Sequence, residues 1–385
     1  MNNTLFYTGI ENLRQCASCV MDSTDPDIQF DKDGVCNYCL NYSYRKGLFV
    51  PDKITQKQQL DELVRFCRNN GKDKVYDCVI GVSGGVDSTY VAYLVKQLGL
   101  RPLAVHLDNG WNSELAISNI RSTLQKLEIE LHTFVLDWEE FRDLQLAFLR
   151  ASTPDSEIPT DHAIVALLRK IANDEDIPVI WGVNFSSESI LPQAWSQGHM
   201  DWTYIRNVNR KFGERRLKTF PHYSIWKLIY YNRFRRQRLF NILNLIDYNK
   251  EEAKRLLLSE LGWRDYGGKH YESVYTRIFQ SYILPVKFGF DKRKAHYSSL
   301  ILAEQMSRSE ALRLLEIPPF DKETIESDIQ YLVKKLKITQ DVFNGIMALP
   351  PKTYHDYRSK WIDSVKRAEK IIFRLLISAK KKVFR

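Results

Sequence analysis

A short loop with two glycines is the first feature of this sequence that could do chemistry. It follows an apolar run, precedes a helical pattern and comprises Ser83, Gly84, Gly85, Val86, Asp87 and Ser88. Glycine lets the backbone approach a ligand closely, and the N-terminus of the following helix offers unpaired N–H groups and a partial positive charge. The loop therefore suits a phosphate chain. Asp87 is a poor neighbour for phosphate unless a divalent cation lies between them, so we assign Asp87 to Mg²⁺.

Four cysteines near the N-terminus form a second chemical group. They occur as two C-x2-C pairs separated by 16 residues, at Cys16, Cys19, Cys36 and Cys39. This spacing is typical of a zinc site with four thiolate ligands, which leaves no open position for catalysis. Asp33-Gly34 favours a tight turn that returns the second pair to the first. Two disulfides are the competing interpretation, but the sequence shows no export signal, so we expect structural Zn²⁺.

Short apolar runs alternate with helical patterns around the glycine loop. Residues 77–82, 102–107, 131–136 and 178–183 are each predicted to be a strand. This alternation indicates an α/β fold with a parallel sheet and helices on both of its faces. Ligands bind such sheets at the carboxyl ends of the strands. The loops 83–88, 108–111 and 184–189 are therefore expected to hold the ligands.

The composition limits the class of protein. The 385 residues include 56 Lys and Arg against 47 Asp and Glu, a net charge of +9, with 44% hydrophobic and 27% charged residues. These values exclude a wholly disordered, collagen-like or coiled-coil chain. We read no secretory signal at the N-terminus and expect a cytoplasmic protein. No transmembrane segment is predicted, because the best apolar stretch, 223–248, carries Lys and Arg in its middle. We interpret the basic stretch 206–238 as a surface that docks a partner or a membrane.

We divide the chain into four parts. They are a zinc-binding module (1–45), a connector (46–73), a phosphate-binding and substrate domain (74–315) and a helical C-terminal extension (316–385). The extension is predicted to contain three helices, with Pro350-Pro351 between the second and the third. Proline favours this boundary because it has no N–H group for a helical hydrogen bond.

The glycine loop and several longer strings resemble known families. SGGVDS resembles the pyrophosphate loop of the ATP pyrophosphatases, the superfamily of asparagine synthetase, GMP synthetase, NAD synthetase and the tRNA thiolation enzymes. No GxxxxGK[ST] string is present, so a γ-phosphate-transferring P-loop enzyme is not supported. From about residue 14 to 315, CVMDSTDPDIQFDKDGVCNYC, WGVNFSSE, YNKEEAKRLLLSELGWRDYGGKHYES and ILPVKFGFDKRKAHYSSLI resemble the N-acetyl sugar amidotransferase family. The resemblance implies a sheet of the adenine nucleotide alpha hydrolase-like type.

The resemblance also implies a reaction. An acetamido group on a bacterial surface-polysaccharide sugar, such as one of a lipopolysaccharide O-antigen, would become an acetamidino group with ATP and ammonia. An amide is a poor electrophile, and adenylation of its oxygen releases pyrophosphate and makes an imidate from which ammonia displaces AMP. The implied cofactors are ATP, Mg²⁺ and structural Zn²⁺, and the implied substrate is a nucleotide-activated acetamido sugar.

By analogy with related sites, we assign the departing pyrophosphate to Lys292 and Arg293. Lys287 is a weaker candidate for the same role. His296 either contacts phosphate or caps the helix that follows it. Charge neutralisation by such groups is the main catalytic need when pyrophosphate leaves.

Other candidates lie where predicted strands end. Asp108 and Asn109 follow the second strand and either contact adenosine or form a simple turn. Asn184 and Glu188 follow the fourth strand. A carboxylate at Glu188 could share Mg²⁺ or take a proton from ammonium, and its alternative is a surface helix position.

The remaining substrate candidates are histidines and one lysine. Thr160 or Asp161 is interpreted as a helix N-cap, and His162 beside them as a possible substrate contact. His199 lies in an aromatic, polar segment that could face a sugar. Lys269 and His270 follow paired glycines, which either bring the backbone to an anionic ligand or form a structural turn.

The sequence carries no glutaminase signature. Cys67 is predicted in a polar helix and Cys78 in a buried strand, so neither is expected to be a nucleophile. The resemblance implies that ammonia comes from a glutaminase subunit similar to the histidine-biosynthesis amidotransferase, with a cyclase-like subunit that channels it.

Two other functions remain open. A tRNA-modifying enzyme would use the basic charge to bind nucleic acid, but a thiolation mechanism lacks its cysteine pair here, and no nucleic acid partner is expected. A binding or scaffold protein would leave SGGVDS and DKRKAH unexplained.

Overall fold

Five parallel strands form the centre of the protein. The computed structural model describes residues 13–267 and 271–358. The strands run in the order β3-β2-β1-β4-β5, and every neighbouring pair is parallel. Their bounds are β1 (Cys78–Gly81), β2 (Pro102–Asp108), β3 (Glu130–Val135), β4 (Val179–Trp181) and β5 (Leu239–Asn241). The α/β class and the first four strands are as predicted from the sequence.

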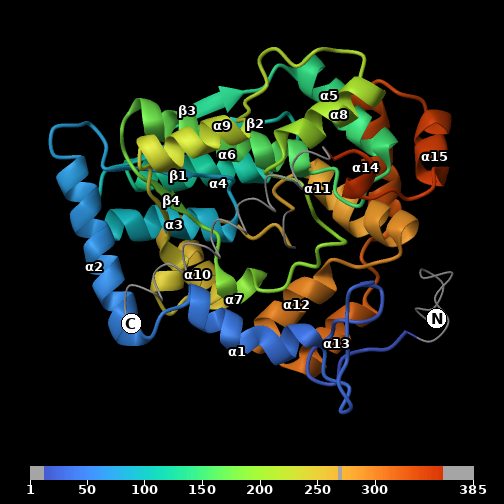
Figure 1. Cartoon of the computed structure of the whole chain (residues 1–385), viewed down its shortest axis with the longest axis horizontal. Coiled ribbons are helices and arrows are strands. Elements are labelled where there is room, and N and C mark those ends of the chain that lie inside the picture. Colours follow the sequence, from blue (N-terminus) through green and yellow to red (C-terminus); the bar gives the residue numbers. More distant parts are fainter. Residues whose placement is uncertain (1–12, 268–270, 359–385) are drawn as a thin grey trace, which may run out of the picture.

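Helices cover both faces of the sheet, because side chains along a strand point alternately to its two sides. In β1, Cys78 and Ile80 belong to one buried cluster and Val79 to the other. Figure 1 shows the two layers, with α3 and α6 on opposite sides of the strands. One face carries α2 (Lys53–Asn70), α3 (Val86–Gln97), α4 (Glu114–Lys126) and α10 (Lys250–Leu256), and the other α5 (Trp138–Ala151), α6 (Ile158–Asp174), α8 (Trp202–Phe212), α11 (Val274–Ile278) and α14 (Lys322–Leu336).

Shorter helices complete the described part of the chain. They are α1 (Asn37–Phe49), α7 (Phe185–Glu188), α9 (Ile225–Ile229), α12 (Arg293–Leu302), α13 (Arg308–Glu316) and α15 (Gln340–Ala348), the π-helical turns η2 (Tyr230–Phe234), η4 (Leu257–Leu261) and η5 (Phe279–Phe288), and the 3-10 turns η3 (Ile242–Leu245) and η6 (Tyr354–Asp356). None of the helices in residues 13–267 and 271–358 is long and apolar enough to cross a membrane.

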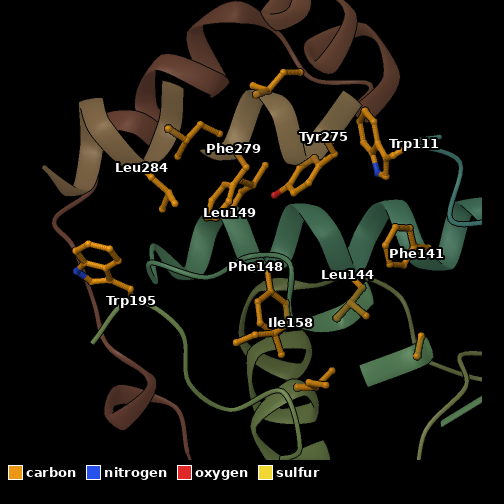
Figure 2. Packing of buried hydrophobic residues seen from close by; sticks show 14 of the residues in the cluster. Trp111, Phe141, Leu144, Phe148, Leu149, Ile158, Trp195, Tyr275, Phe279 and Leu284 are labelled. Atoms are coloured by element: carbon orange, nitrogen blue, oxygen red, sulfur yellow. The ribbon is translucent and has the colours of Figure 1, made fainter. Parts of the chain in front are cut away.

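The larger of the two buried clusters lies around α5. Figure 2 shows Phe148 and Leu144 pointing toward Ile158 on α6, while Tyr275 and Phe279 reach toward α5 from the opposite side. Tyr275 and Phe279 lie one helical turn apart, and their rings stack with centroids 6.0 Å apart. This packing joins the C-terminal segment to the sheet domain.

Two expectations about elements need correction, and a third is not tested. β5 was not predicted, since its three residues directly follow a run of arginines and give no apolar period. α6 begins at Ile158, with Pro159 in its first turn, so Thr160 and Asp161 lie inside the helix and do not cap it. The third predicted helix of the C-terminal extension lies outside the described residues.

The cysteine module is seated on α12 and α13, far from it in sequence (Figure 1). Lys294 forms a buried ion pair with Asp22. Arg308 donates to the carbonyl oxygens of Cys16 and Cys19, each over 3.0 Å. The Val20 N–H donates to Ser298 Oγ over 3.1 Å. The module is therefore an integral part of the molecule, anchored by charge and by backbone hydrogen bonds.

Candidate active site at the carboxyl edge of the sheet

The glycine loop joins β1 to α3 in a conformation that only glycine adopts without strain. Gly84 has φ +82°, and a Cβ built there would lie 2.6 Å from the carbonyl oxygen of Ala116. The indole N–H of Trp263 donates to the Gly84 carbonyl over 2.8 Å. Ser83 Oγ and Ser88 Oγ lie 3.2 Å apart across the loop. The predicted loop is thus a tight turn fixed by packing on both sides.

Asp87 is held by two side chains that come from other loops. The hydroxyl of Tyr248 donates to Asp87 Oδ1, and Asn184 Nδ2 approaches the same oxygen at 3.5 Å. Burial and the Asp87 charge raise the pKa of Tyr248 well above its usual range, so the tyrosine remains a donor. Asp87 Oδ2 makes no hydrogen bond within the described residues. An aligned carboxylate with one open oxygen fits a ligand for Mg²⁺.

A cavity of about 1420 Å³ opens over this loop. Several predicted site residues line it: Ser83, Val86, Ser88, Asn109, Glu188, His199, Lys292, Arg293 and His296. The cavity is large enough for a nucleotide together with a second substrate, since small-molecule sites typically measure about 300–1,000 Å³. The structure therefore brings together loops that lie up to 213 positions apart in the sequence, from Ser83 to His296.

Acidic side chains surround Lys292. Its ammonium lies 3.5 Å from Glu157 Oε2. Although burial opposes its charge, the carboxylates of Glu157, Asp155 and Asp161 raise the pKa of Lys292. Desolvation by the surrounding protein, together with Asp155 and Glu157, raises the pKa of Asp161 to about 8, although part of the residue is exposed to the cavity. Lys292 is therefore part of an ionic cluster at the cavity wall.

The other predicted phosphate ligands are engaged with protein groups. The Arg293 guanidinium forms a two-pronged ion pair with Asp291 and donates to the carbonyl of Ile317. The ammonium of Lys287 donates to the carbonyls of Ile346 and Met347 at the end of α15, away from the cavity. Because burial lowers its pKa to about 8 and its contacts are structural, Lys287 does not fit the phosphate role.

His296 is not a helix cap, because α12 is preceded by Lys292 at its N-cap position. Its Nδ1 lies 3.2 Å from the carbonyl oxygen of Ser187, and the residue lines the cavity. The structure thus excludes the capping role for His296, and the contact with a ligand in the cavity stays a prediction.

His162 occupies a different position from the one expected. It is completely buried, and its ring stacks on Tyr223 at 4.4 Å between centroids. Nδ1 contacts the His199 carbonyl and Nε2 accepts from the Tyr223 N–H. Burial lowers the pKa of His162 to about 4, so the ring is neutral and serves packing. His199 itself is exposed in the cavity.

The remaining predicted residues mainly shape the local backbone. Asp108 Oδ1 accepts from the Gly110 N–H over 2.8 Å, which forms the Asn-Gly turn. Asn109 Nδ2 donates to Thr160 Oγ1 over 3.1 Å. Asn184 caps α7 through the Ser187 N–H. Lys269 and His270 lie outside the described residues.

Sequence reasoning missed Tyr248 and Lys250. Lys250 is 9% exposed, opens α10 and lines the cavity beside the Tyr248–Asp87 pair. Within the described residues its ammonium has no carboxylate at ion-pair distance. The sequence Tyr248-Asn249-Lys250 precedes two glutamates, which is a pattern typical of a helix start. Asn249 caps α10 and thereby fixes the positions of Tyr248 and Lys250. Lys250 is better placed to receive an anion than Lys292 or Arg293, whose charges are already balanced.

The four N-terminal cysteines converge on one point. Their sulfurs all lie within 4.8 Å of one another. Three of the Sγ–Sγ distances are 3.5, 3.7 and 3.8 Å. A tetrahedral ion with metal–sulfur bonds of about 2.3 Å separates its sulfurs by roughly 3.8 Å. Backbone N–H groups of Ser18 and Met21 point at Cys16 and Cys19 sulfur respectively. The group is thus built to hold one metal ion.

Two family models match the sequence. Residues 272–371 match "LPS biosynthesis protein WbpG-like, C-terminal domain", and residues 47–149 match "NAD synthase". No curated protein matches the chain.

Solved structures similar to the chain include three enzymes. The U34-tRNA thiolase NcsA of Methanococcus maripaludis is 16% identical over 80% of this chain and 89% of that one, with a TM-score of 0.32. The NH3-dependent NAD synthetase of Campylobacter jejuni is 16% identical over 77% and 98%, with a TM-score of 0.30. The NMN synthetase of Francisella tularensis is 14% identical over 57% and 90%, with a TM-score of 0.28.

Proposed function

Because the chain combines a PP-loop ATP pyrophosphatase domain with a WbpG-like C-terminal domain, we propose that it is an ATP-dependent sugar amidotransferase. It converts an acetamido group of a surface-polysaccharide sugar into an acetamidino group. The observation that carries this proposal is that both matched regions line one cavity: Ser83 and Ser88 belong to the first region, and Lys292 and His296 belong to the second. A nucleotide on the loop would therefore face a substrate held by the lipopolysaccharide-related domain.

The proposed chemistry has two steps. The amide oxygen of the acetamido group attacks the α phosphorus of ATP, the bond to the β phosphate breaks, and pyrophosphate leaves. Ammonia then attacks the resulting imidate carbon, and AMP leaves with the former amide oxygen. The carbon–oxygen bond is replaced by a carbon–nitrogen bond, and one proton of ammonia must be removed.

The residues of this chain have separable roles in these steps. The loop 83–88 positions the phosphates, and Asp87, oriented by Tyr248, holds the Mg²⁺ that screens their charge. Lys250 receives the departing pyrophosphate. The raised pKa of Asp161, about 8, suits it to accept a proton from ammonium near neutral pH, and Glu188 is the second candidate for that role.

Zn²⁺ is proposed at the four cysteines in a structural role. The sulfurs would fill all of its tetrahedral positions, so none remains for substrate. The site lies on α12, which also carries Arg293 and His296 of the cavity wall. The metal would therefore stabilise the support of the active site and take no part in the reaction.

Ammonia is proposed to come from a partner glutaminase, with a cyclase-like subunit channelling it, in the cytoplasm where ATP is made. Cys67 and Cys78 are fully buried, so neither described thiol outside the cysteine module reaches the cavity. This burial also disfavours tRNA thiolation by a cysteine pair. With ammonium salt the isolated chain should be active, and glutamine should replace ammonium only when the partner subunits are added.

A mass-spectrometric screen tests the function. Nucleotide-linked diacetamido sugars are incubated with ATP, Mg²⁺ and ammonium, and we expect a product in which NH replaces one oxygen, with one AMP and one pyrophosphate formed per product. Lys250→Met should lower turnover at least tenfold, whereas Arg255→Met, an exposed change on the same helix, should not. Turnover only with tRNA, or glutamine use by the chain alone, would contradict the proposal.

A further inference from the structure

Arg169 is a buried guanidinium that has no carboxylate partner among residues 13–267 and 271–358. It is 7% exposed and belongs to α6. Its Nη1 donates to the side-chain oxygens of Asn232 and Gln237, over 3.0 and 3.4 Å. Both are neutral amides. The Nε–H donates to no atom, and Nη2 makes no hydrogen bond within the described residues. A buried charge normally requires an ion pair, because removing it from water is costly.

The other buried Lys and Arg side chains show how unusual a buried charge without a carboxylate partner is among the described residues. Lys and Arg are buried at three positions in the described part of the chain, namely Arg169, Lys250 and Lys294. Lys294 pairs with Asp22. Lys250 lies beside the phosphate loop, where a nucleotide would balance its charge. Arg169 alone has neither a carboxylate nor a place at the phosphate loop, and burial lowers its pKa.

Arg169 lines the same cavity as the glycine loop, and we call the part of the cavity beside Arg169 the Arg169 wing. On α6, Asp161, Val165, Leu168 and Arg169 line the cavity along one helix face. Two helical turns, about 12 Å, separate Asp161 from Arg169. Trp181 also lines the cavity, and its indole N–H is buried and donates to no atom of the described residues. The guanidinium of Arg169 therefore brings a charge that no described carboxylate balances to the wall of this cavity.

We propose that this wing, the Arg169 wing, is a subsite for an anionic oxygen group, a carboxylate or a phosphate, of the substrate that reacts at the loop. The planar guanidinium can grip two oxygens of such a group, which a lysine cannot do. The statement that this anionic group belongs to the acceptor sugar rests on the proposed function. The statement that Arg169 binds an anion does not rest on it, because binding is measured without turnover.

The test compares wild type with Arg169→Met and Arg169→Lys. Asn232 and Gln237 are accessible to water, so the methionine variant should fold with an unchanged or higher melting temperature, since a buried unpaired charge is removed. The control is Lys170→Met, which removes a charge from the exposed neighbour on the same helix. The loop is first saturated with Mg²⁺ and a non-hydrolysable ATP analogue. Calorimetry then measures binding of UDP-glucuronate, UDP-glucose and inorganic phosphate.

Each outcome decides the proposal. Affinity at least tenfold lower in Arg169→Met for UDP-glucuronate alone supports the subsite and identifies a carboxylate. An equal loss for both UDP sugars, or for inorganic phosphate, supports it and identifies a phosphate. Arg169→Lys should lose about fivefold, and this variant decides if the methionine variant is insoluble. If the variants and wild type bind every probe with the same affinity, or bind none of the probes, the proposal is overturned. It is also overturned if Lys170→Met loses as much affinity as Arg169→Met.

Discussion

At the scale of single residues, the site depends on side chains that orient or balance one another. The loop alone makes Asp87 a candidate ligand for Mg²⁺, because a carboxylate beside phosphates implies a cation. Its partner Tyr248 lies 161 positions away in the sequence, and no local pattern links the two. The same is true of Lys292, whose cationic character was evident but whose carboxylate neighbours were not.

Removing the hydroxyl that orients Asp87 should impair catalysis more than folding. In Tyr248→Phe the ring still packs on Tyr90, while a charge-assisted hydrogen bond typically contributes about 1.5–3 kcal/mol. We expect pyrophosphate release to slow at least tenfold and to require more Mg²⁺. The control is Tyr93→Phe, since Tyr93 also stacks on Tyr90 and its hydroxyl makes no hydrogen bond within the described residues. Equal rates in the two variants would show that Tyr248 does not position Asp87.

The acidic cluster should make stability depend on pH. Desolvation by the surrounding protein raises the pKa of Asp161 from 3.8 to about 8, with Asp155, Glu157 and Glu188 adding to the rise and Lys292 opposing it. Between these two values the folded protein holds a proton that the unfolded chain has lost, so this group's contribution to stability falls as pH rises.

Asp161→Asn removes that proton equilibrium. Relative to wild type, the variant should therefore be more stable at pH 8.5 than at pH 5, as measured by urea unfolding. The control is Ile164→Val, which changes a nearby uncharged side chain on the same helix. It should change the free energy of unfolding by the same amount at both pH values. A difference between Asp161→Asn and wild type that does not vary with pH would contradict the raised pKa.

At the scale of elements, most of the sheet follows from local patterns. Four strands are short apolar runs, and buried parallel strands are recognisable in this way. β5 is not, because its residues Leu239–Asn241 form an edge whose pairing with β4 is decided by the tertiary fold. The start of α6 was misplaced for a similar reason: Thr160 and Asp161 have capping side chains, but the helix begins earlier, at Ile158.

The loop between β1 and α3 should not tolerate a side chain at its second position. In Gly84→Ala the added Cβ would lie 2.6 Å from Ala116 oxygen, at a φ of +82°, so the loop or α4 must move. We expect the affinity for ATP to fall at least tenfold in a folded protein. Gly289→Ala is the matched control, because φ is +73° and no atom lies within 4 Å, so that only backbone strain, about 1–2 kcal/mol, is added.

If Gly84→Ala binds ATP as tightly as Gly289→Ala, the loop does not carry the phosphates. Fluorescence titration with a labelled ATP analogue measures both affinities, and thermal unfolding separates loss of binding from loss of fold. A large drop in melting temperature for Gly84→Ala alone would indicate a general packing defect.

At the scale of the whole molecule, the cysteine module and the active site are mechanically linked. Asp22 and Lys294 form a buried pair, and breaking such a pair by removing one partner typically costs about 3–5 kcal/mol. Arg308 adds hydrogen bonds to the backbone of Cys16 and Cys19. The cysteine module is therefore tied to α12 and α13, and we expect an ion held by its thiols to stabilise these helices as well as its own loop.

Removing the metal should lower the stability of the entire protein. Zinc binding to four thiolates contributes about 10 kcal/mol or more to folding of small modules. After treatment with a chelator we expect a lower melting temperature, loss of ATP turnover and four newly reactive thiols. Cys67 and Cys78, which are fully buried, should stay protected, so a thiol count of four against six separates module loss from global unfolding. Elemental analysis that finds no zinc in purified protein would contradict the assignment.

By itself, the sequence determined the groups whose parts are close together: the loop 83–88, the paired cysteines and the alternation of strands and helices. Each of these groups depends on the spacing of residues that are close together in the sequence, so it can be recognised without the fold. Only the tertiary structure decided which distant side chains meet, such as Tyr248 with Asp87 and Lys292 with Glu157, and that Arg169 meets no acid among the described residues. Charge balance inside a protein depends on neighbours in space, and for that reason the assignment of each cation to a ligand or to a protein partner had to wait for the fold.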